Sequence, residues 1–331
     1  MITVVNMSAL KPTFYQSFWD QRQWSQHRTW DDIPTSPYDL CLAFLLSPLL
    51  FILRILYEAI VGGYITKKMH NECYSRVIYL QLSGEFIDND YLPHLLSCFY
   101  RLTSYIALTV YGFTVLFDKP WATDVKYAFI DYPFHPLDTT LSWYFTVQCA
   151  FYMSSMYMMV FDIQCIDTYR ISMMNLTTLI GIILSYSINI LRCGTLMLFL
   201  HDLNNSLMEM SWILKFWGKH QNACKAMLIV FFVSWVATRL ICFPLFVGYT
   251  ILSMIPALSQ TQYQLWNPFQ QPYAPRLILA MLAGLMFVHV YWTFYIFKVV
   301  FKAYNKSAES DARWLFVASD FDESEESSKT K

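Results

Sequence analysis

Long apolar runs dominate the pattern of hydrophobic and polar positions along the chain. A helix of about 20 apolar residues is long enough to cross the hydrocarbon core of a bilayer. Runs near this length recur at residues 38–62, 99–117, 139–161, 171–191, 193–214, 224–252 and 276–301. The pattern therefore predicts an all-α, polytopic transmembrane helical bundle of about seven spans.

Two details of the pattern predict local geometry. The fourth and fifth runs meet at Leu191 and Arg192, so we expect these two helices to form a tight hairpin. The sixth run contains Pro244. Proline lacks a backbone N–H, and we expect the helix to tilt or break near it.

Polar segments and charges divide the chain and predict an orientation. The expected parts are an N-terminal segment 1–37, a first span 38–62, a connector 63–98, a unit of six helices 99–305 and a tail 306–331. Lys and Arg are more numerous on the side that carries the connector and the tail. The positive-inside rule therefore predicts that this side is cytosolic and that the N-terminus is lumenal. Asn6, in Asn6-Met7-Ser8, is then a lumenal glycosylation acceptor. The acidic, Ser-rich tail end SDFDESEESSKTK is expected to be disordered.

Composition excludes several functional classes. The chain is 56% hydrophobic and only 14% charged, well below the roughly 25% charged residues of a soluble domain. Its net charge of −1 and its lack of Lys/Arg blocks exclude a strongly basic nucleic-acid binder. The eight cysteines show no zinc-binding spacing, so we interpret them as small apolar residues and predict no metal site.

Ionisable side chains inside the predicted spans are the candidate functional residues. Such groups are costly in hydrocarbon and usually face a bundle interior or a cavity. They are Arg54, Glu58, Asp162, His201, Asp202, Glu209, Arg239 and His289. Arg54 and Glu58 lie four residues apart on a helix, so we expect them to form a structural pair. We interpret His289 as a packing histidine.

The fifth run carries the densest polar face. His201, Asn205 and Glu209 recur at four-residue spacing, and Asp202 is adjacent. One side of this helix therefore presents an imidazole, an amide and carboxylates together. Such a face fits a reaction chamber, a pocket for a lipid head group, or a network of hydrogen bonds between helices.

Four stretches of sequence together resemble a known family. They are FDKPWATDVKYAFIDYP (117–133), FYMSSMYMMVFD (151–162), SYSINILRCGTLMLFLHD (185–202) and TRLICFPL (238–245). From about Phe99 to Asn305, their order and spacing are similar to those of the ceramide synthase (sphingosine N-acyltransferase) branch of the TLC-domain membrane proteins. The resemblance implies the TLC-domain fold for 99–305. It also implies N-acylation of a sphingoid base by a fatty acyl-CoA, in the endoplasmic reticulum membrane.

The resemblance also implies site residues, and the chain departs from some of them. The family's chemistry is attributed to adjacent paired histidines on the fourth span and an H-D-x-x-D face on the fifth. His201 and Asp202 match that face, whereas Asn205 replaces its second aspartate. Ungapped counting from the motifs on either side places the histidine pair at Met174 and Asn175, which supply neither a base nor an acyl acceptor. The implied substrate-cavity residues are Asp162, Arg192, Glu209 and Arg239.

Three hypotheses follow from these residues. The first is a catalytically impaired paralogue, or pseudoenzyme, that binds sphingoid base, ceramide or acyl chain, or forms a homodimer or a heterodimer with an active ceramide synthase. The second is an active acyltransferase in which His201 serves as base, oriented by Asp202 or Glu209. The third is a lipid or protein trafficking factor of the TLC type. We expect no cofactor, with fatty acyl-CoA as the co-substrate of an active form.

Overall fold

The computed structural model describes residues 34–82, 91–124, 127–128, 135–161, 168–217, 221–245, 248, 267 and 274–305. Within these residues all regular structure is helical, which confirms the predicted all-α class. The elements in chain order are η3 (Pro37–Leu40), α3 (Cys41–Leu82), α4 (Tyr91–Leu116), α5 (Pro120–Thr123), α6 (Thr139–Phe161), α7 (Thr168–Ser187), α8 (Leu191–Trp217), α9 (Gln221–Val236), η5 (Ala237–Cys242) and α11 (Ala274–Asn305).

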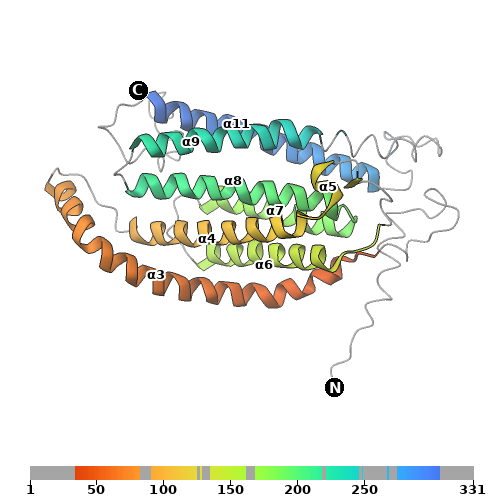
Figure 1. Ribbon diagram of the computed structural model, residues 1–331, viewed down its shortest axis with the longest axis horizontal. Helices are drawn as coiled ribbons and strands as arrows, with labels where there is room; N and C mark the ends of the chain where they lie inside the picture. Colours follow the sequence, from red (N-terminus) through yellow and green to blue (C-terminus); the bar gives the residue numbers. More distant parts are fainter. Residues whose placement is uncertain are drawn as a thin grey trace, which may run out of the picture.

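The long helices lie side by side and alternate in direction (Figure 1). α3 runs along one side of the bundle and α11 along the opposite side. Between them α6 packs on α3 and α7, α4 packs on α8, and α9 lies between α8 and α11. Most of the described part of each predicted apolar run lies on one of these helices, and the sixth continues from α9 into η5.

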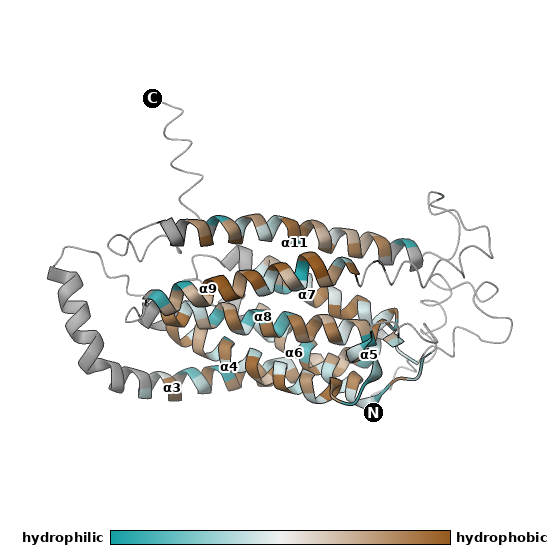
Figure 2. Ribbon diagram, turned by 45° about the horizontal axis from the view of Figure 1, so that its top comes forward, coloured by the Kyte–Doolittle hydropathy of each residue, from teal (hydrophilic) through white to brown (hydrophobic). Residues whose placement is uncertain are grey.

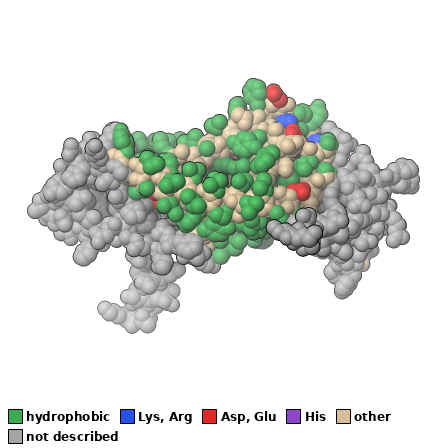
Figure 3. Space-filling model, turned by 90° about the horizontal axis from the view of Figure 1, so that it is seen from below, with side chains coloured by type: hydrophobic (Ala, Val, Ile, Leu, Met, Phe, Trp, Pro, Cys, Tyr) green, Lys and Arg blue, Asp and Glu red, His purple; other side chains and the backbone are tan. Residues whose placement is uncertain are grey.

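The outer surface of the bundle is apolar. Leu45 on α3 is 74% exposed and Phe287 on α11 is 79% exposed. Brown, hydrophobic positions run along α9 and α11 in Figure 2, and green apolar side chains are spread over the described part of the face drawn in Figure 3. Exposed apolar area on this scale fits a lipid surrounding rather than water.

Length and composition identify membrane-spanning candidates among the described helices. Three segments are long and apolar enough to cross a membrane, and they are Tyr38–Gly62, Asn222–Leu245 and Leu279–Lys298. Ser172–Ser187 is a shorter apolar helix. The chain is therefore a multi-pass membrane protein, and the exact number of seven spans stays a prediction.

The helix that carries the predicted first span extends beyond it. The candidate span Tyr38–Gly62 matches the predicted run 38–62, whereas α3 continues to Leu82, and α4 begins at Tyr91. Residues 64–82 contain neither glycine nor proline, so nothing in the local sequence terminates the helix. The expected connector 63–98 is therefore largely helical in its described parts.

The hairpin between α7 and α8 is tight, as predicted, but its turn lies at residues 188–190. Leu191 and Arg192 already belong to α8. Asn189 has a φ of 56°, and the N–H of Ile190 donates to the carbonyl oxygen of Ser185 at 2.9 Å. This is the Schellman arrangement that ends a helix, and asparagine tolerates its left-handed residue better than most side chains.

A π-turn precedes Pro244 at the place where the sequence predicted a distortion. In η5, the backbone N–H of Phe243 donates to the carbonyl oxygen of Thr238, five residues earlier. Because proline cannot donate and its ring displaces the carbonyl four residues back, the helix widens locally. The widened turn carries the buried residues Thr238 and Arg239.

The core of the bundle forms around α6. Its largest fully buried side chains include Tyr144, Phe145 and Tyr152. α8 approaches this aromatic cluster closely at Gly194, where an added Cβ would lie 2.9 Å from Cζ of Phe145. A glycine at this position therefore sets the distance between α6 and α8.

A polar cluster stabilises the start of α6. The Asp138 carboxylate accepts hydrogen bonds from the backbone N–H of Thr140 at 3.0 Å and from Lys119. It acts as an N-cap, and the bond from Lys119 is the main cause that lowers its pKa. Burial, with a smaller effect of the Arg192 charge, lowers the pKa of His135 to about 4.

We expect acid to destabilise this end of the bundle. An unfolded histidine has a pKa near 6.5, so between about pH 6.5 and pH 4 the unfolded chain binds a proton that the folded chain does not. Stability conferred by neutral His135 is thus complete above this window and falls by on the order of 3 kcal/mol as the pH drops through it. Unfolding in detergent, measured across this window, should show this slope. His135→Gln should flatten it, and an unchanged slope would contradict the assignment.

Candidate functional site

A cavity lies among α6, α7, α8, α9 with η5, and α11. Its volume is about 150 Å³, on a scale on which one water needs about 10–15 Å³. Along α7 it extends from Met174 to Ser185, which is about 16 Å of helix. Most of the lining is apolar, and the basic side chains in it are His201, Arg239 and His289.

His201 lines this cavity with both ring nitrogens engaged. Arg239 donates from Nη2 to Nδ1, and Nε2 lies 3.5 Å from Oγ1 of Thr178. A guanidinium group has no acceptor, so Nδ1 must be the unprotonated nitrogen and Nε2 must carry the proton. The Thr178 hydroxyl donates to the carbonyl oxygen of Met174 at 3.0 Å, which leaves its oxygen to accept from His201. The contacts thus fix one neutral tautomer.

Arg239 occupies the centre of the polar part of the cavity. Its side chain comes from the π-turn, and its guanidinium carbon lies 5.3 Å from the centre of the Trp235 ring. Its Nη1 lies 3.4 Å from Nε2 of His289. The His289 ring packs edge-on against Phe243 at 4.7 Å between ring centres. His289 therefore packs against an aromatic ring and also lines the cavity, which its isolated position in the sequence did not reveal.

Asp202 points away from His201 and towards α6. Gln148 donates from Nε2 to its Oδ2, and the Tyr144 hydroxyl lies 3.5 Å from the same oxygen. The other carboxylate oxygen, Oδ1, is buried and has no hydrogen-bond partner among the residues that the structure describes, and the same holds for the hydroxyl of Tyr152. Within the described residues neither Asp202 nor Glu209 forms a hydrogen bond or ion pair with His201, whose ring nitrogens face Arg239 and Thr178 instead.

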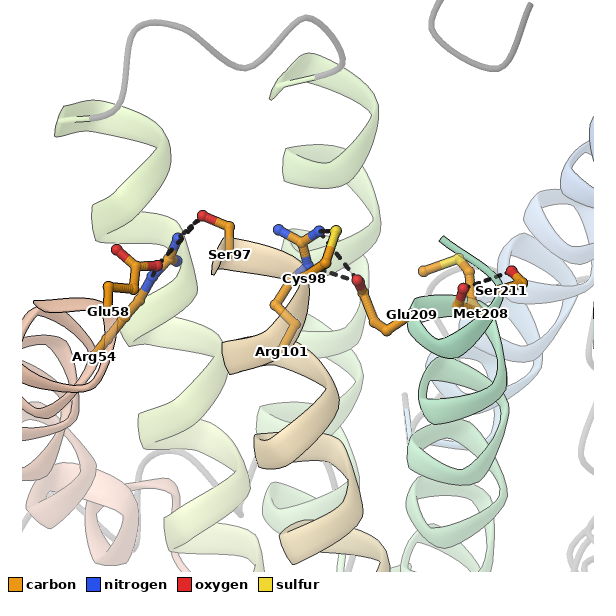
Figure 4. A network of polar contacts seen from close by, with 8 residues as sticks. All are labelled: Arg54, Glu58, Ser97, Cys98, Arg101, Met208, Glu209 and Ser211. Atoms are coloured by element: carbon orange, nitrogen blue, oxygen red, sulfur yellow. Dashed lines mark hydrogen bonds and ion pairs between the residues drawn. The ribbon is translucent and has the colours of Figure 1, made fainter. Parts of the chain in front are cut away.

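Glu209 belongs to a separate ion pair. Its two carboxylate oxygens accept from Nε and Nη2 of Arg101 on α4, at 2.6 and 3.1 Å (Figure 4). A second pair, from Nε of Arg54 to Glu58 at 2.8 Å, follows the predicted four-residue spacing. Arg54 also donates to Oγ of Ser97, so it links α3 to α4. Both pairs fit a structural role.

A buried network that sequence reasoning missed joins α8 to the end of α9. Asn204 donates from Nδ2 to Oγ1 of Thr238 at 2.5 Å, and Ser234 donates to Oδ1 of Asn204 at 2.6 Å. In the sequence, Asn204 stands out only as part of a glycosylation-like tripeptide. The network holds the π-turn, and with it Arg239, against α8.

The remaining predicted residues take different positions. Met174 lines the cavity, whereas Asn175 and Asn205 are buried but are not part of its lining. Arg192 lies outside the cavity, with its guanidinium over the Trp121 ring at 4.8 Å and a hydrogen bond to the carbonyl oxygen of Tyr127. Asp162 and Asn6 lie outside the described residues. The roles assigned to all these residues stay predictions.

The described side chains do not gather into a metal site. Within the residues that the structure covers, no group of three or more His, Cys, Asp or Glu side chains could hold a metal ion. The cavity instead offers donors, which suit an anionic or carbonyl oxygen, beside an apolar wall that suits a hydrocarbon chain.

Comparison with known proteins identifies related sequences. The TLC-domain family profile matches residues 95–298. Ceramide synthase hyl-1 of Caenorhabditis elegans is 32% identical over 307 residues, which cover 89% of this chain and 83% of the worm protein. Ceramide synthase hyl-2 of the same worm is 29% identical, covering 68% of this chain and 67% of its own length. Human ceramide synthase 5 is 30% identical over 62% of this chain and 49% of its own length.

Proposed function

The chain belongs to the TLC-domain family, in its ceramide synthase branch, and from that premise we propose that it is a lipid-binding member with impaired acyltransferase chemistry. It is a ceramide-synthase-like protein of sphingolipid metabolism. In this proposal the cavity between α7, α8 and α11 receives a sphingoid base, a ceramide or an acyl chain. The protein then acts by holding lipid, or by pairing with an active relative.

One observation carries the proposal. A general base must present an unprotonated nitrogen within hydrogen-bond distance of the proton it takes up. His201 lines the cavity, but its Nδ1 accepts from Arg239 and its Nε2 faces the hydroxyl of Thr178. Met174, which the ungapped count assigns to the first histidine of the pair, lines the same cavity with a thioether that cannot transfer a proton.

The location and topology of the protein complete the proposal. We place it in the endoplasmic reticulum membrane with a lumenal N-terminus, glycosylated at Asn6, and a cytosolic tail. The excess of Lys and Arg on one side of the predicted bundle supports this orientation. Its lipid partners would reach the cavity from the membrane, because the outer surface of the described helices is apolar.

A direct assay tests the impaired chemistry. The purified chain, incubated with sphinganine and fatty acyl-CoAs of several chain lengths, is expected to form no ceramide above background. Mass spectrometry of lipids that copurify is expected to find sphingoid bases, ceramides or acyl chains. Recovery of mixed phospholipid alone would favour a general lipid carrier, and turnover would refute the impairment.

The exposure of His201 to the cavity favours a second candidate, an active N-acyltransferase. In that case Arg239 would have to release Nδ1 when substrate binds. Turnover that His201→Ala abolishes, and that Asp202→Asn reduces less, would support this candidate because Asp202 has no contact with the imidazole.

A further inference from the structure

Arg239 is a buried cation without a carboxylate partner within the described residues. Its residue surface is only 7% exposed. Arg54 and Arg101 each pair with a glutamate at 2.8 Å or less. Burying a charge without a counter-charge is costly, and the cost is normally offset by an ion pair and full hydrogen bonding. The immediate neighbours of Arg239 are instead two imidazoles and an indole ring.

The site around Arg239 has more donors than acceptors. The guanidinium group carries five N–H donors, and its Nε has no partner among the described residues. His289 can accept from Arg239 only through an unprotonated Nε2, so its Nδ1 carries a proton, and that nitrogen is also buried with no partner in the described part of the chain. An oxygen anion is the complementary group for such a set of donors.

Asp202 does not supply this anion. Its carboxylate lies on the α6 side of α8, where Gln148 and Tyr144 contact it. Among the described residues it forms no ion pair with Arg239. The positive charge of Arg239 therefore remains available on the cavity side.

The space beside Arg239 suits a hydrocarbon chain. Met281, Leu282 and Leu285 of α11 form one wall of the cavity, and Ile182 and Met197 contribute from α7 and α8. A ligand that fills this space and satisfies Arg239 has an oxygen-anion head and a single apolar chain.

We propose that Arg239 and His289 form a binding site for the head group of a single-chain anionic lipid, either a fatty carboxylate or a lipid phosphate. The head group lies beside the guanidinium group of Arg239 and the ring of His289, and the chain extends along α7 and α11. This inference rests on the proposed function, because it assumes that the cavity holds lipid. It adds that the head group is negatively charged and that Arg239 recognises it.

Tryptophan quenching can test the head-group preference directly. Trp235 and Trp292 line the cavity, so a brominated acyl chain bound there should quench their fluorescence. The delipidated full chain is titrated in detergent with dibromostearate and with the matched dibromostearyl alcohol. We expect the carboxylate to bind about ten- to a hundredfold more tightly. Displacement of the bromolipid by sphinganine 1-phosphate and by sphinganine then compares a phosphate with a cationic head.

Substitutions test whether Arg239 causes the preference for an anionic head group. Arg239→Gln keeps amide donors but removes the charge, so the carboxylate should lose most of its advantage over the alcohol. His289→Phe, which retains the edge-on packing against Phe243, should weaken carboxylate binding less. The comparison of head groups on the unaltered chain stands even if a variant fails to fold.

The possible outcomes distinguish failure of the anion site from failure of the proposed lipid binding. Stronger binding of stearate or of the phosphate identifies which anion the site takes. Equal binding of acid and alcohol, or a preference for cationic sphinganine, overturns the anion site but leaves a lipid-binding cavity. Absence of quenching by every bromolipid overturns the proposed lipid binding itself.

Discussion

The double substitution Met174→His and Asn175→His is expected to raise sphinganine N-acylation from background by at least about a hundredfold. A positioned acid or base typically contributes about 10²- to 10⁴-fold to a rate. Met174 lines the cavity and precedes by one helical turn Thr178, whose hydroxyl faces His201. An imidazole at this position would face the space beside His201 with a ring nitrogen that no described residue occupies. Ceramide formed from labelled sphinganine and acyl-CoA measures the gain.

Single variants and a control locate the effect. Met174→His alone should provide most of the gain, because Asn175 does not line the cavity. Thr177→His is a matched control, since Thr177 also lines the cavity from α7 but is not a paired-histidine position. Equal gains from both positions would show that any imidazole suffices. No gain from the double variant would contradict the explanation of impairment by the lost histidines.

Removal of the charge of Glu209 is expected to cost about 1–3 kcal/mol of unfolding free energy, because Glu209→Gln leaves Arg101, whose side chain is 23% exposed, without its counter-ion. The Glu209 side chain is only 3% exposed, and its two bonds to Arg101 join α8 to α4. Unfolding in mixed micelles of maltoside and SDS, followed by circular dichroism, measures the loss.

The Arg54–Glu58 pair provides the matched control. It lies within one helix, Glu58 is 24% exposed, and Arg54 keeps its bond to Ser97 when Glu58 is neutralised. Glu58→Gln should therefore cost less than about 1 kcal/mol. The combined Arg101→Met and Glu209→Met variant should recover most of the loss, because an apolar pair leaves no buried charge. Similar losses for both single glutamate variants would contradict a special role of the α4–α8 pair.

The helices were predictable because apolar runs of membrane-spanning length identify them without any knowledge of their neighbours. The directions of individual side chains were not. His201 and Glu209 fit one polar face by four-residue spacing, yet eight residues rotate the side chain by about 80° on a helix. His201 therefore reaches the cavity, whereas Glu209 reaches Arg101 on α4. Asp202, about 100° from His201, faces α6.

Contacts between distant helices also escaped prediction. His289 follows Arg239 by fifty residues, and nothing in the sequence near either residue indicates that they meet. The partners Gln148 and Thr178 have ordinary polar side chains in apolar runs, so composition did not single them out. A pair of polar residues on different spans is recognisable in sequence only when their variation can be compared among many relatives.

The π-turn has a consequence for how this chain tolerates a change in length. A π-turn contains one residue more than an α-turn, so deletion of a single residue within Ala237–Cys242 can return the backbone to a regular helix without breaking it. The helix would survive, but Trp235 and Phe243 would no longer face the same space. A variant with such a deletion is expected to fold but to bind lipid with a changed preference, because the bundle stays intact while the side chains on one wall of the cavity point in new directions.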